Sequence, residues 1–385
     1  MENVTLNSMV PLWHKNKNEI SEEEYNSFYK DKCGDYTDPL CHMHVRNEGT
    51  ITYDALLYIP SHTPFNYYSK DYEKGLQLYA NGVLIMDRCE DLLPDYFSFV
   101  KGLVDSEDLS LNISREMLQH DAQLRQIARS IERTIKNDRE KYEKFYQAFG
   151  LQLKYGIYQD YGMHKDLLQD LLLFPSSKDG KLVSLKEYVD RMPEGQDKIY
   201  YAAGESIARI ESLPQTEQVK DKGYEILYFT ENVDEFAIRM MQGYQEKQFQ
   251  SVLDSNLDLE SEEEKKELEE KQESSKDMLE AVKKALEGKV GNVKLSGRLK
   301  SHPVCLSSEG ELSMEMAKTL NAMPGTEGQK LQAQTVLEIN PEHPIYQRLM
   351  ELQTGDSAKL DDYAKLLYDQ ALLIAGMPVE DPVAF

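Results

Sequence analysis

From Asn7 to about Val252, strand-like runs of apolar residues alternate with helix-like patterns. Residues 21–30 begin with Ser21 and carry Glu24 three positions later, which is the capping box of a helix N-terminus. An Asn81-Gly82 pair lies inside one apolar run and predicts a hairpin turn. Three runs rich in β-branched and aromatic residues, each bounded by Gly, Pro or Asp, predict strands: residues 52–60, 75–87 and 223–230. The pattern therefore predicts a mixed α/β fold.

A longer helical pattern starts near Asn112 and places Arg115 in its first turn. A cation at that position opposes the helix macrodipole at a cost of ~0.3–1 kcal/mol. Arg115 and Gln119 fall opposite the apolar side, and a guanidinium beside free backbone N–H groups suits an anion such as a phosphate. The alternative, which geometry alone favours, is a surface ion pair with a nearby acid such as Asp108 or Glu116. The predicted apolar side consists of Met117, Leu124, Ile127, Ala128, Ile131 and Ile135.

The composition changes near Leu253. Residues 257–277 are almost entirely charged and predict a solvated linker or helix, with Glu262 and Lys266 as an i,i+4 pair. An amphipathic helix follows and stops at Gly288. We therefore expect a first domain over residues 1–255, a charged linker or helix over 256–277, and a second domain over 278–385.

The end of the chain predicts two further elements. Residues 361–377 have the pattern of a strong amphipathic helix. Asp381 and Pro382 are typical of the N-cap and first position of another helix, yet the sequence stops three residues later. We therefore expect the chain to be truncated within its final helix.

Charge and composition exclude several classes of protein. The chain has 68 acidic and 44 basic residues, a formal net charge of −24, which disfavours binding to nucleic acid or anionic membranes. No apolar run reaches the ~18–20 residues of a membrane span, and the N-terminus lacks the features of a secretory signal. The four cysteines lie apart, as in proteins with reduced thiols. We expect a cytoplasmic protein without nucleic-acid or membrane partners.

The sequence contains no phosphate-binding glycine motif, so we expect no nucleotide site within this chain. Cys33, Cys41, His42 and His44 are potential metal ligands, but their spacing does not match a zinc site. An ordinary loop of reduced thiols is the simpler interpretation. We therefore expect no metal and no cofactor in this chain.

Two apolar features admit both a structural and a functional interpretation. Leu312, Met316, Leu320 and Met323 recur at helical spacing between glycines. Methionine side chains suit promiscuous apolar contacts, although such a stripe more often packs into a core. The single tryptophan, Trp13, would ordinarily be buried as well.

Several long blocks resemble the heat-shock protein 90 chaperone family, most closely its bacterial members. They include "NSMVPLWHKNKNEISEEEYNSFYK", "ALLYIPSHTPFNYYSKDYEKGLQLY", "LIMDRCEDLLPDYFSFVKGLVDSEDLSLNISREMLQ" and "IYYAAGES". They occur in order, and the resemblance covers essentially all 385 residues. It implies a layered α-β-α middle domain and a smaller α+β C-terminal domain, without the family's N-terminal ATP-binding domain.

The resemblance also implies roles for individual residues. Arg115 would contact the γ-phosphate of ATP, bound with Mg²⁺ in the absent N-terminal domain, and Gln119 and Asn112 belong to the same catalytic loop. The implied client-binding positions are a partly exposed Trp13 and, on the methionine-rich helix, Met316, Leu320 and Met323.

We therefore expect a fragment of a molecular chaperone that binds partly folded clients and has no ATPase activity alone. Family members form homodimers through their last helices, so dimerisation is expected to be weakened here. A helix that is shorter than in relatives after Lys136 could shift Arg115. The alternative is an interaction scaffold, or an inactive truncated product, without chaperone activity.

Overall fold

The computed structural model describes residues 10–48, 52–67, 69, 72–106, 127–129, 137–323, 331–379 and 381–383. The chain divides into two units, Met1–Leu173 and Phe174–Phe385, and each is considered by itself. The sequence did not predict a boundary at this point. The domain limits proposed at residues 255 and 278 fall within the second unit and stay predictions. The predicted mixed α/β fold class is confirmed by the helices and sheets of both units.

The described part of unit 1 contains a five-stranded sheet with the order β1-β2-β5-β3-β4. Its pairings are antiparallel except for β3 with β5, which run parallel. The two predicted strand regions form β2 and the β3–β4 hairpin, and the hairpin turns at Asn81 and Gly82 with φ of 50° and 75°. The strands are β1 (Cys41–Glu48), β2 (Thr52–Ile59), β3 (Leu76–Ala80), β4 (Val83–Cys89) and β5 (Lys101–Ser106).

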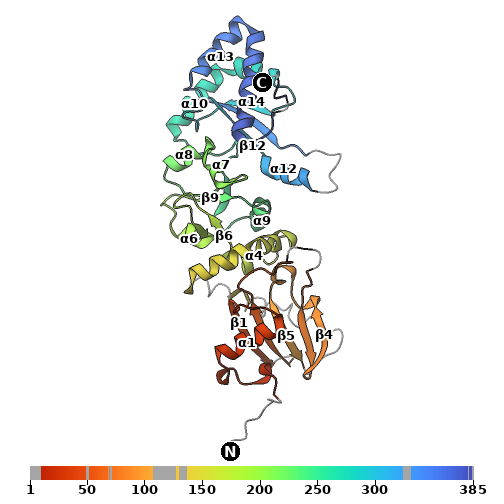
Figure 1. Ribbon diagram of the computed structural model, residues 1–385. Helices are drawn as coiled ribbons and strands as arrows, with labels where there is room; N and C mark the ends of the chain where they lie inside the picture. Colours follow the sequence, from red (N-terminus) through yellow and green to blue (C-terminus); the bar gives the residue numbers. More distant parts are fainter. Residues whose placement is uncertain are drawn as a thin grey trace, which may run out of the picture. The chain divides into compact units, whose positions relative to one another are not determined.

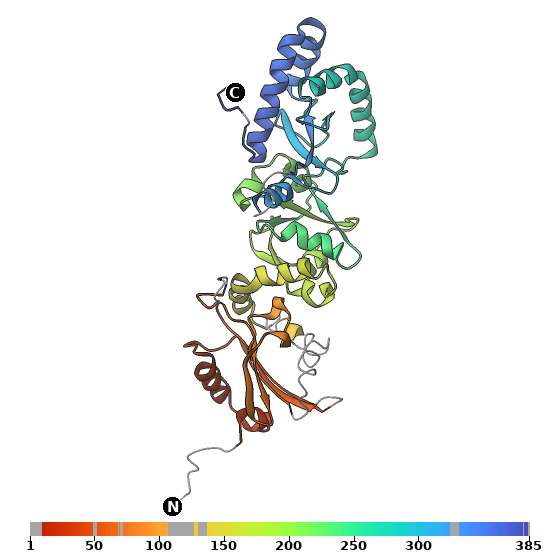
Figure 2. The same cartoon turned by 90° about the vertical axis from the view of Figure 1, so that its right-hand side faces the viewer.

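Helix α1 (Glu22–Cys33) lies against this sheet (Figures 1 and 2). Ser21 and Glu24 form the predicted capping box, and Gly34 ends the helix in the left-handed conformation. Buried residues of α1 pack with sheet residues in one cluster that contains Trp13, Tyr25, Tyr29, Leu56, Tyr58, Tyr79 and Leu103. The cluster therefore joins the start of the described chain to the middle of the sheet.

Helix α4 (Arg139–Gln159) forms a second aromatic core in unit 1. Phe145 and Phe149 pack against Phe99, which follows the short 3₁₀ helix Asp95–Phe97. Gly156 permits the close approach, because a Cβ there would lie 2.4 Å from the Cβ of Tyr96. The short helix α5 (Lys165–Leu168) follows.

Unit 2 begins with the ladder of β6 (Leu173–Pro175) and β7 (Leu182–Ser184), followed by a parallel sheet of order β10-β8-β9. The predicted strand in residues 223–230 is β9. The sheet strands are β8 (Lys198–Ala203), β9 (Ile226–Phe229) and β10 (Gln248–Ser251). The helices around them are α6 (Leu185–Asp190), α7 (Ile207–Glu211), α8 (Gln215–Asp221) and α9 (Asp234–Met241).

A second three-stranded sheet follows in unit 2, with β13 (Gln334–Ile339) between β11 (Asn292–Leu295) and β12 (Val304–Glu309). Its core includes the predicted apolar residues of α11 and α14, and α14 packs on β12, α11 and α13. The helices are α10 (Glu262–Ser274), α11 (Lys276–Ala285), α12 (Met314–Ala322), α13 (Pro344–Gly355) and α14 (Ser357–Ala375). None of the helices in the described residues combines the length and apolarity needed to cross a membrane.

The charged segment predicted as a linker forms helix α10. Ser261 and Glu264 make a capping box, and none of the residues of α10 is buried. The expected pair of Glu262 with Lys266 is replaced by ion pairs of Lys265 with Glu262 at 3.3 Å and Asp258 at 2.8 Å. The helix is therefore held by its cap, by surface ion pairs and by the partly buried Leu268, which packs against the core beside it.

A buried guanidinium, Arg298, connects the two sheets of unit 2. Its Nε donates to Glu338 Oε2 at 2.9 Å, and its Nη1 donates to the carbonyl oxygens of Val252 at 2.9 Å and Asp254 at 3.0 Å. Ser307 Oγ donates to Glu338 Oε1 at 2.7 Å. Burial acts to raise the pKa of Glu338, but Arg298 and the other donors outweigh it and hold that pKa below its usual range.

We predict that Arg298→Ala lowers the free energy of unfolding by ~3–5 kcal/mol, because it leaves the Glu338 carboxylate buried without its main partner. Urea unfolding at pH 7 measures the change. Arg348→Ala is the control, since Arg348 pairs with Glu351 at the surface and should contribute less than ~1 kcal/mol. Equal effects of the two substitutions would contradict the central role of Arg298.

Candidate functional sites

The predicted catalytic residues Arg115, Gln119 and Asn112 lie outside the described residues, so the structure does not place them. On either side of this segment, the helical residues that follow it agree with the sequence analysis, whereas the strand that precedes it was not predicted. Strand β5 ends at Ser106, just before this segment, and residues 127–129 are helical. Ile127 and Ala128 are buried there, as expected for the apolar side of the predicted helix.

Asp105, the penultimate residue of β5, is buried and surrounded by hydrogen-bond donors. Its Oδ2 accepts from Trp13 Nε1 at 2.8 Å and from the backbone N–H of Gly82 at 3.0 Å, and it lies 2.9 Å from His14 Nε2. His14 Nδ1 lies 2.7 Å from Asp54 Oδ2. The His14 ring therefore lies between the carboxylates of Asp54 and Asp105.

Trp13 is only 7% exposed, so the partly exposed indole implied by the family resemblance is not found. Its ring packs against Tyr79 at 5.0 Å and Phe28 at 6.0 Å between ring centroids, and its N–H is bound by Asp105. A buried indole with a satisfied N–H is the usual state of tryptophan. The core interpretation of Trp13 is therefore correct, and its contact with clients stays a prediction.

The two histidines near Cys33 and Cys41 are also engaged with protein groups. His44 lies 2.8 Å from the hydroxyl of Tyr25 and 2.9 Å from the carbonyl oxygen of Trp13. The His42 ring stacks on Tyr25, with 3.9 Å between centroids. Within the described residues, no group of three or more His, Cys, Asp or Glu side chains could hold a metal ion.

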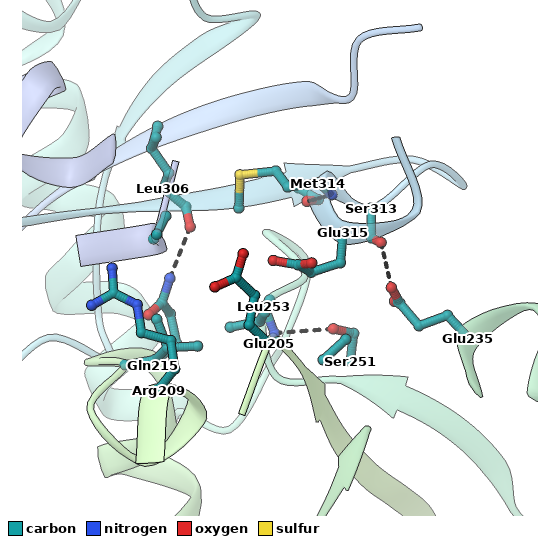
Figure 3. Close-up of a pocket in the computed structure, with 16 residues that line it drawn as sticks. Glu205, Arg209, Gln215, Glu235, Ser251, Leu253, Leu306, Ser313, Met314 and Glu315 are labelled. Carbon is teal, nitrogen blue, oxygen red and sulfur yellow. Dashed lines mark hydrogen bonds between the residues drawn. The ribbon is translucent and has the colours of Figure 1, made fainter. Parts of the chain in front are cut away.

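The methionine-rich helix predicted near residue 314 is α12, and its N-terminus is tied to α9 (Figure 3). Ser313 is the N-cap: its Oγ accepts from the Met316 N–H at 3.0 Å and donates to Glu235 Oε2 at 2.6 Å. One hydroxyl therefore both caps α12 and fixes it to the buried carboxyl of another helix.

Glu235 is 5% exposed, and its burial raises the pKa of its carboxyl to about 7. The hydrogen bond from Ser313 and the charge of Arg239 act in the opposite direction, whereas the charges of Glu315 and Asp234 raise the pKa further. The carboxyl is therefore close to its point of ionisation at neutral pH.

Two cavities adjoin α12. The first, of about 30 Å³, is lined by residues of α7, α8, β12 and the start of α12, including Glu205, Arg209 and Glu315 (Figure 3). The second, of about 190 Å³, is lined by Met316 and Thr319 of α12 together with Phe229 and other residues that follow β9. Lys318 pairs with Glu205 across this region.

This arrangement buries one part of the predicted stripe of methionine and leucine residues and exposes the other part. Met316 is only 6% exposed and faces the second cavity, and Leu320 is half-buried. Met323, which follows α12, is 40% exposed. Leu331 is 44% exposed, and its backbone is held by Asn321 at 2.9 Å and 2.7 Å. The exposed apolar surface therefore lies at the C-terminal end of α12.

The sequence analysis did not identify the polar residues that surround α12. Glu235, Glu205 and Arg209 come from residues 205–235, far from α12 along the chain. Ser313 carried a recognisable signal, since a serine before an amphipathic stretch is typical of an N-cap. Glu235 carried none, because a buried glutamate and a surface glutamate look alike in a helix pattern.

Comparison of the chain with known proteins identifies its family. A family profile described as Hsp90 protein matches residues 1–385. The chain belongs to the Hsp90 family. The proteins similar to this Hsp90 chain include Chaperone protein HtpG of Bacillus subtilis, 57% identical over 392 residues, and that of Clostridium perfringens, 58% identical over 393 residues. Each alignment covers 100% of this chain and 62% of the relative, so this Hsp90 chain spans less than two thirds of their length.

We predict that Glu235 makes this Hsp90 chain less stable as pH rises. The folded pKa of about 7 exceeds the ordinary value of 4.5, so the folded state binds more protons between these limits. Its contribution is complete below pH 4.5 and is lost as pH rises through 7, by ~3 kcal/mol.

The measurement is urea unfolding at pH 5 and pH 8 for the native protein and for Glu235→Gln. Glutamine can still accept the Ser313 hydrogen bond, so this variant should lose that part of the pH dependence and be the more stable protein at pH 8. Glu311→Gln, an exposed substitution just before α12, is the control. An unchanged pH dependence in Glu235→Gln would show that this carboxyl is already ionised at pH 5.

Proposed function

We propose that this chain is part of a molecular chaperone that binds partly folded proteins. Membership of the Hsp90 family supports the proposal, and relatives that match the full chain carry the name chaperone protein. The observation that carries it is the exposed apolar end of α12, formed by Met323 and Leu331 with Leu320 partly exposed beside them. Contiguous exposed apolar side chains beside polar ones are typical of an interaction surface.

The way α12 is held also supports this role. Its first turn is fixed through Ser313 and Glu235, and Met316 is buried against the second cavity. The helix can therefore present its other end without unfolding. Flexible methionine and leucine side chains suit contacts with many unrelated apolar sequences. In this proposal Met316 anchors the helix, while Leu320 and Met323 contact the client.

We also propose that Arg115, with Gln119 and Asn112, completes an ATPase site when a nucleotide-binding domain supplies ATP and Mg²⁺. The support is the sequence pattern: an arginine in the first turn of a predicted helix, suited to neutralising charge on a transferring phosphoryl group. The buried Asp105 cluster holds the end of β5 only a few residues before this segment.

We propose that α14 mediates homodimerisation, which the family resemblance implies. Leu366 and Leu373 are both 47% exposed and lie seven residues apart, so they share one face of the helix. An apolar face of this kind can pack against the same helix of a second copy. With two exposed leucines on that face, we expect the association to be weak.

We predict that the chain suppresses aggregation of a heat-denatured client protein at stoichiometric amounts. Met323→Glu should reduce this protection at least twofold, because it places a charge in the apolar surface. Light scattering of the client measures the effect. Met163→Glu is the matched control, since Met163 is 78% exposed and lies outside α12. No protection by the native chain would favour an interaction scaffold without chaperone activity, whereas equal protection by the two variants would contradict the role proposed for Met323.

We predict no ATPase activity above background for the chain alone. When it is mixed with a separately prepared nucleotide-binding domain of a relative, hydrolysis should rise, and Arg115→Ala should reduce the stimulated rate by roughly tenfold or more. Arg129→Ala is the control, because Arg129 is exposed on the same predicted helix. Phosphate release measures the rate. An equal rate for Arg115→Ala would contradict the proposed role.

A further inference from the structure

A separate pocket, of about 290 Å³, lies in unit 1 between the C-terminal end of α1 and the sheet. Phe28 of α1, Tyr58 of β2, Leu103 of β5 and Tyr72 give it an aromatic and apolar lining. Its charged lining groups are Lys32, Lys101, Arg88, Glu73 and Asp87.

The two carboxylates that line this pocket are engaged with other groups. Glu73 pairs with Arg88, and both side chains extend to the surface. Asp87 Oδ1 accepts a hydrogen bond from Gln77 Nε2 at 2.8 Å. Glu73 thereby neutralises Arg88, and the two lysines outnumber Asp87, the one carboxylate of the described lining without a cationic partner.

Neither lysine has a carboxylate partner within ion-pair distance among the residues that the structure describes. The Lys101 ammonium lies over the Tyr72 ring, 4.5 Å from its centroid, and its burial lowers its pKa. Lys32 Nζ donates only to the Tyr79 hydroxyl, at 3.3 Å. The pKa of the nearby Cys33 thiol is raised, so this thiol is neutral at pH 7 and provides no negative charge.

We propose that this pocket binds an organic anion, with its carboxylate or phosphate between Lys32 and Lys101 and its apolar part against Phe28 and Tyr72. Lys32 alone could be explained by the helix dipole, since it lies in the last turn of α1. Lys101 alone could be explained by its contact with Tyr72. Neither explanation accounts for two unneutralised ammonium groups lining one open pocket in a chain of net charge −24.

Such a ligand could be a free organic acid or an acidic side chain beside an aromatic one in a polypeptide. The inference does not depend on the proposed chaperone function. Both sources offer the same chemistry, a carboxylate attached to an apolar body. They differ in whether binding to the pocket requires the flanking peptide backbone. Two probes, one with and one without a peptide backbone, can therefore distinguish them.

The experiment is titration of the full chain with phenylacetate and with the blocked dipeptide acetyl-Phe-Glu-amide, followed by NMR. Phenylacetamide, which has the same ring but no charge, is the ligand control. Lys32→Gln and Lys101→Gln should each weaken binding roughly tenfold, because each removes a charged donor. Lys30→Gln is the protein control: Lys30 is in the same turn of α1 but pairs with Asp38 at 2.7 Å and does not line the pocket.

Binding of either probe that depends on both lysines supports the proposal, and the tighter of the two identifies the source. Binding should also weaken as pH rises and Lys101 loses its proton. Lys101→Arg keeps the charge and should retain most of the affinity. If Lys101→Gln fails to fold, Lys32→Gln decides the question, since Lys32 is an exposed residue. Equal affinity in Lys32→Gln and the native chain, binding of phenylacetamide, or no binding at millimolar concentration would overturn the proposal.

Discussion

The arrangement of unit 2 depends on the buried guanidinium of Arg298. It binds the Glu338 carboxylate on β13 and two backbone carbonyls that follow β10, so it joins a strand of one sheet to the end of the other. Two further backbone hydrogen bonds connect the same two sheets. The Ser308 N–H donates to the Leu253 oxygen, and the Ser255 N–H donates to the Ser308 oxygen. Burying these charges is tolerable because they pair with each other and accept or donate further hydrogen bonds.

These contacts between the two sheets of unit 2 set the position of α12. Strand β12 leads directly into the loop before α12, and Ser313 then meets Glu235 on α9. The helix is thereby fixed at one end by polar groups that come from both halves of unit 2. Its apolar end is left at the surface, a division that ordinary core packing of a methionine stripe would not produce. A rigid attachment at Ser313 and an adaptable tip at Met323 are thus combined at the two ends of one short helix.

Local rules predicted much of the fold. The capping box at Ser21, the Asn81-Gly82 hairpin and the stop of α11 near Gly288 each depend on neighbours within a few residues, and each is found. The partners of Trp13, Arg298 and Glu235 are 92, 40 and 78 residues away, so no local pattern could reveal them. For the same reason, the polar residues of the α12 site were missed, and the sequence predicted burial of Trp13 without its partner Asp105. The division between the two units left no composition signal at residue 173.

The cluster of His14 with Asp54 and Asp105 has a consequence for how this protein can evolve. The His14 ring lies within hydrogen-bond distance of two buried carboxylates, and Arg46 is also 3.9 Å from Asp54. An apolar residue in place of His14 would leave both buried carboxylates without this partner, whereas loss of Asp54 first would leave His14 with Asp105. Substitutions should therefore accumulate in a preferred order, with the acid at position 54 replaced before the histidine, and the three positions should covary among relatives.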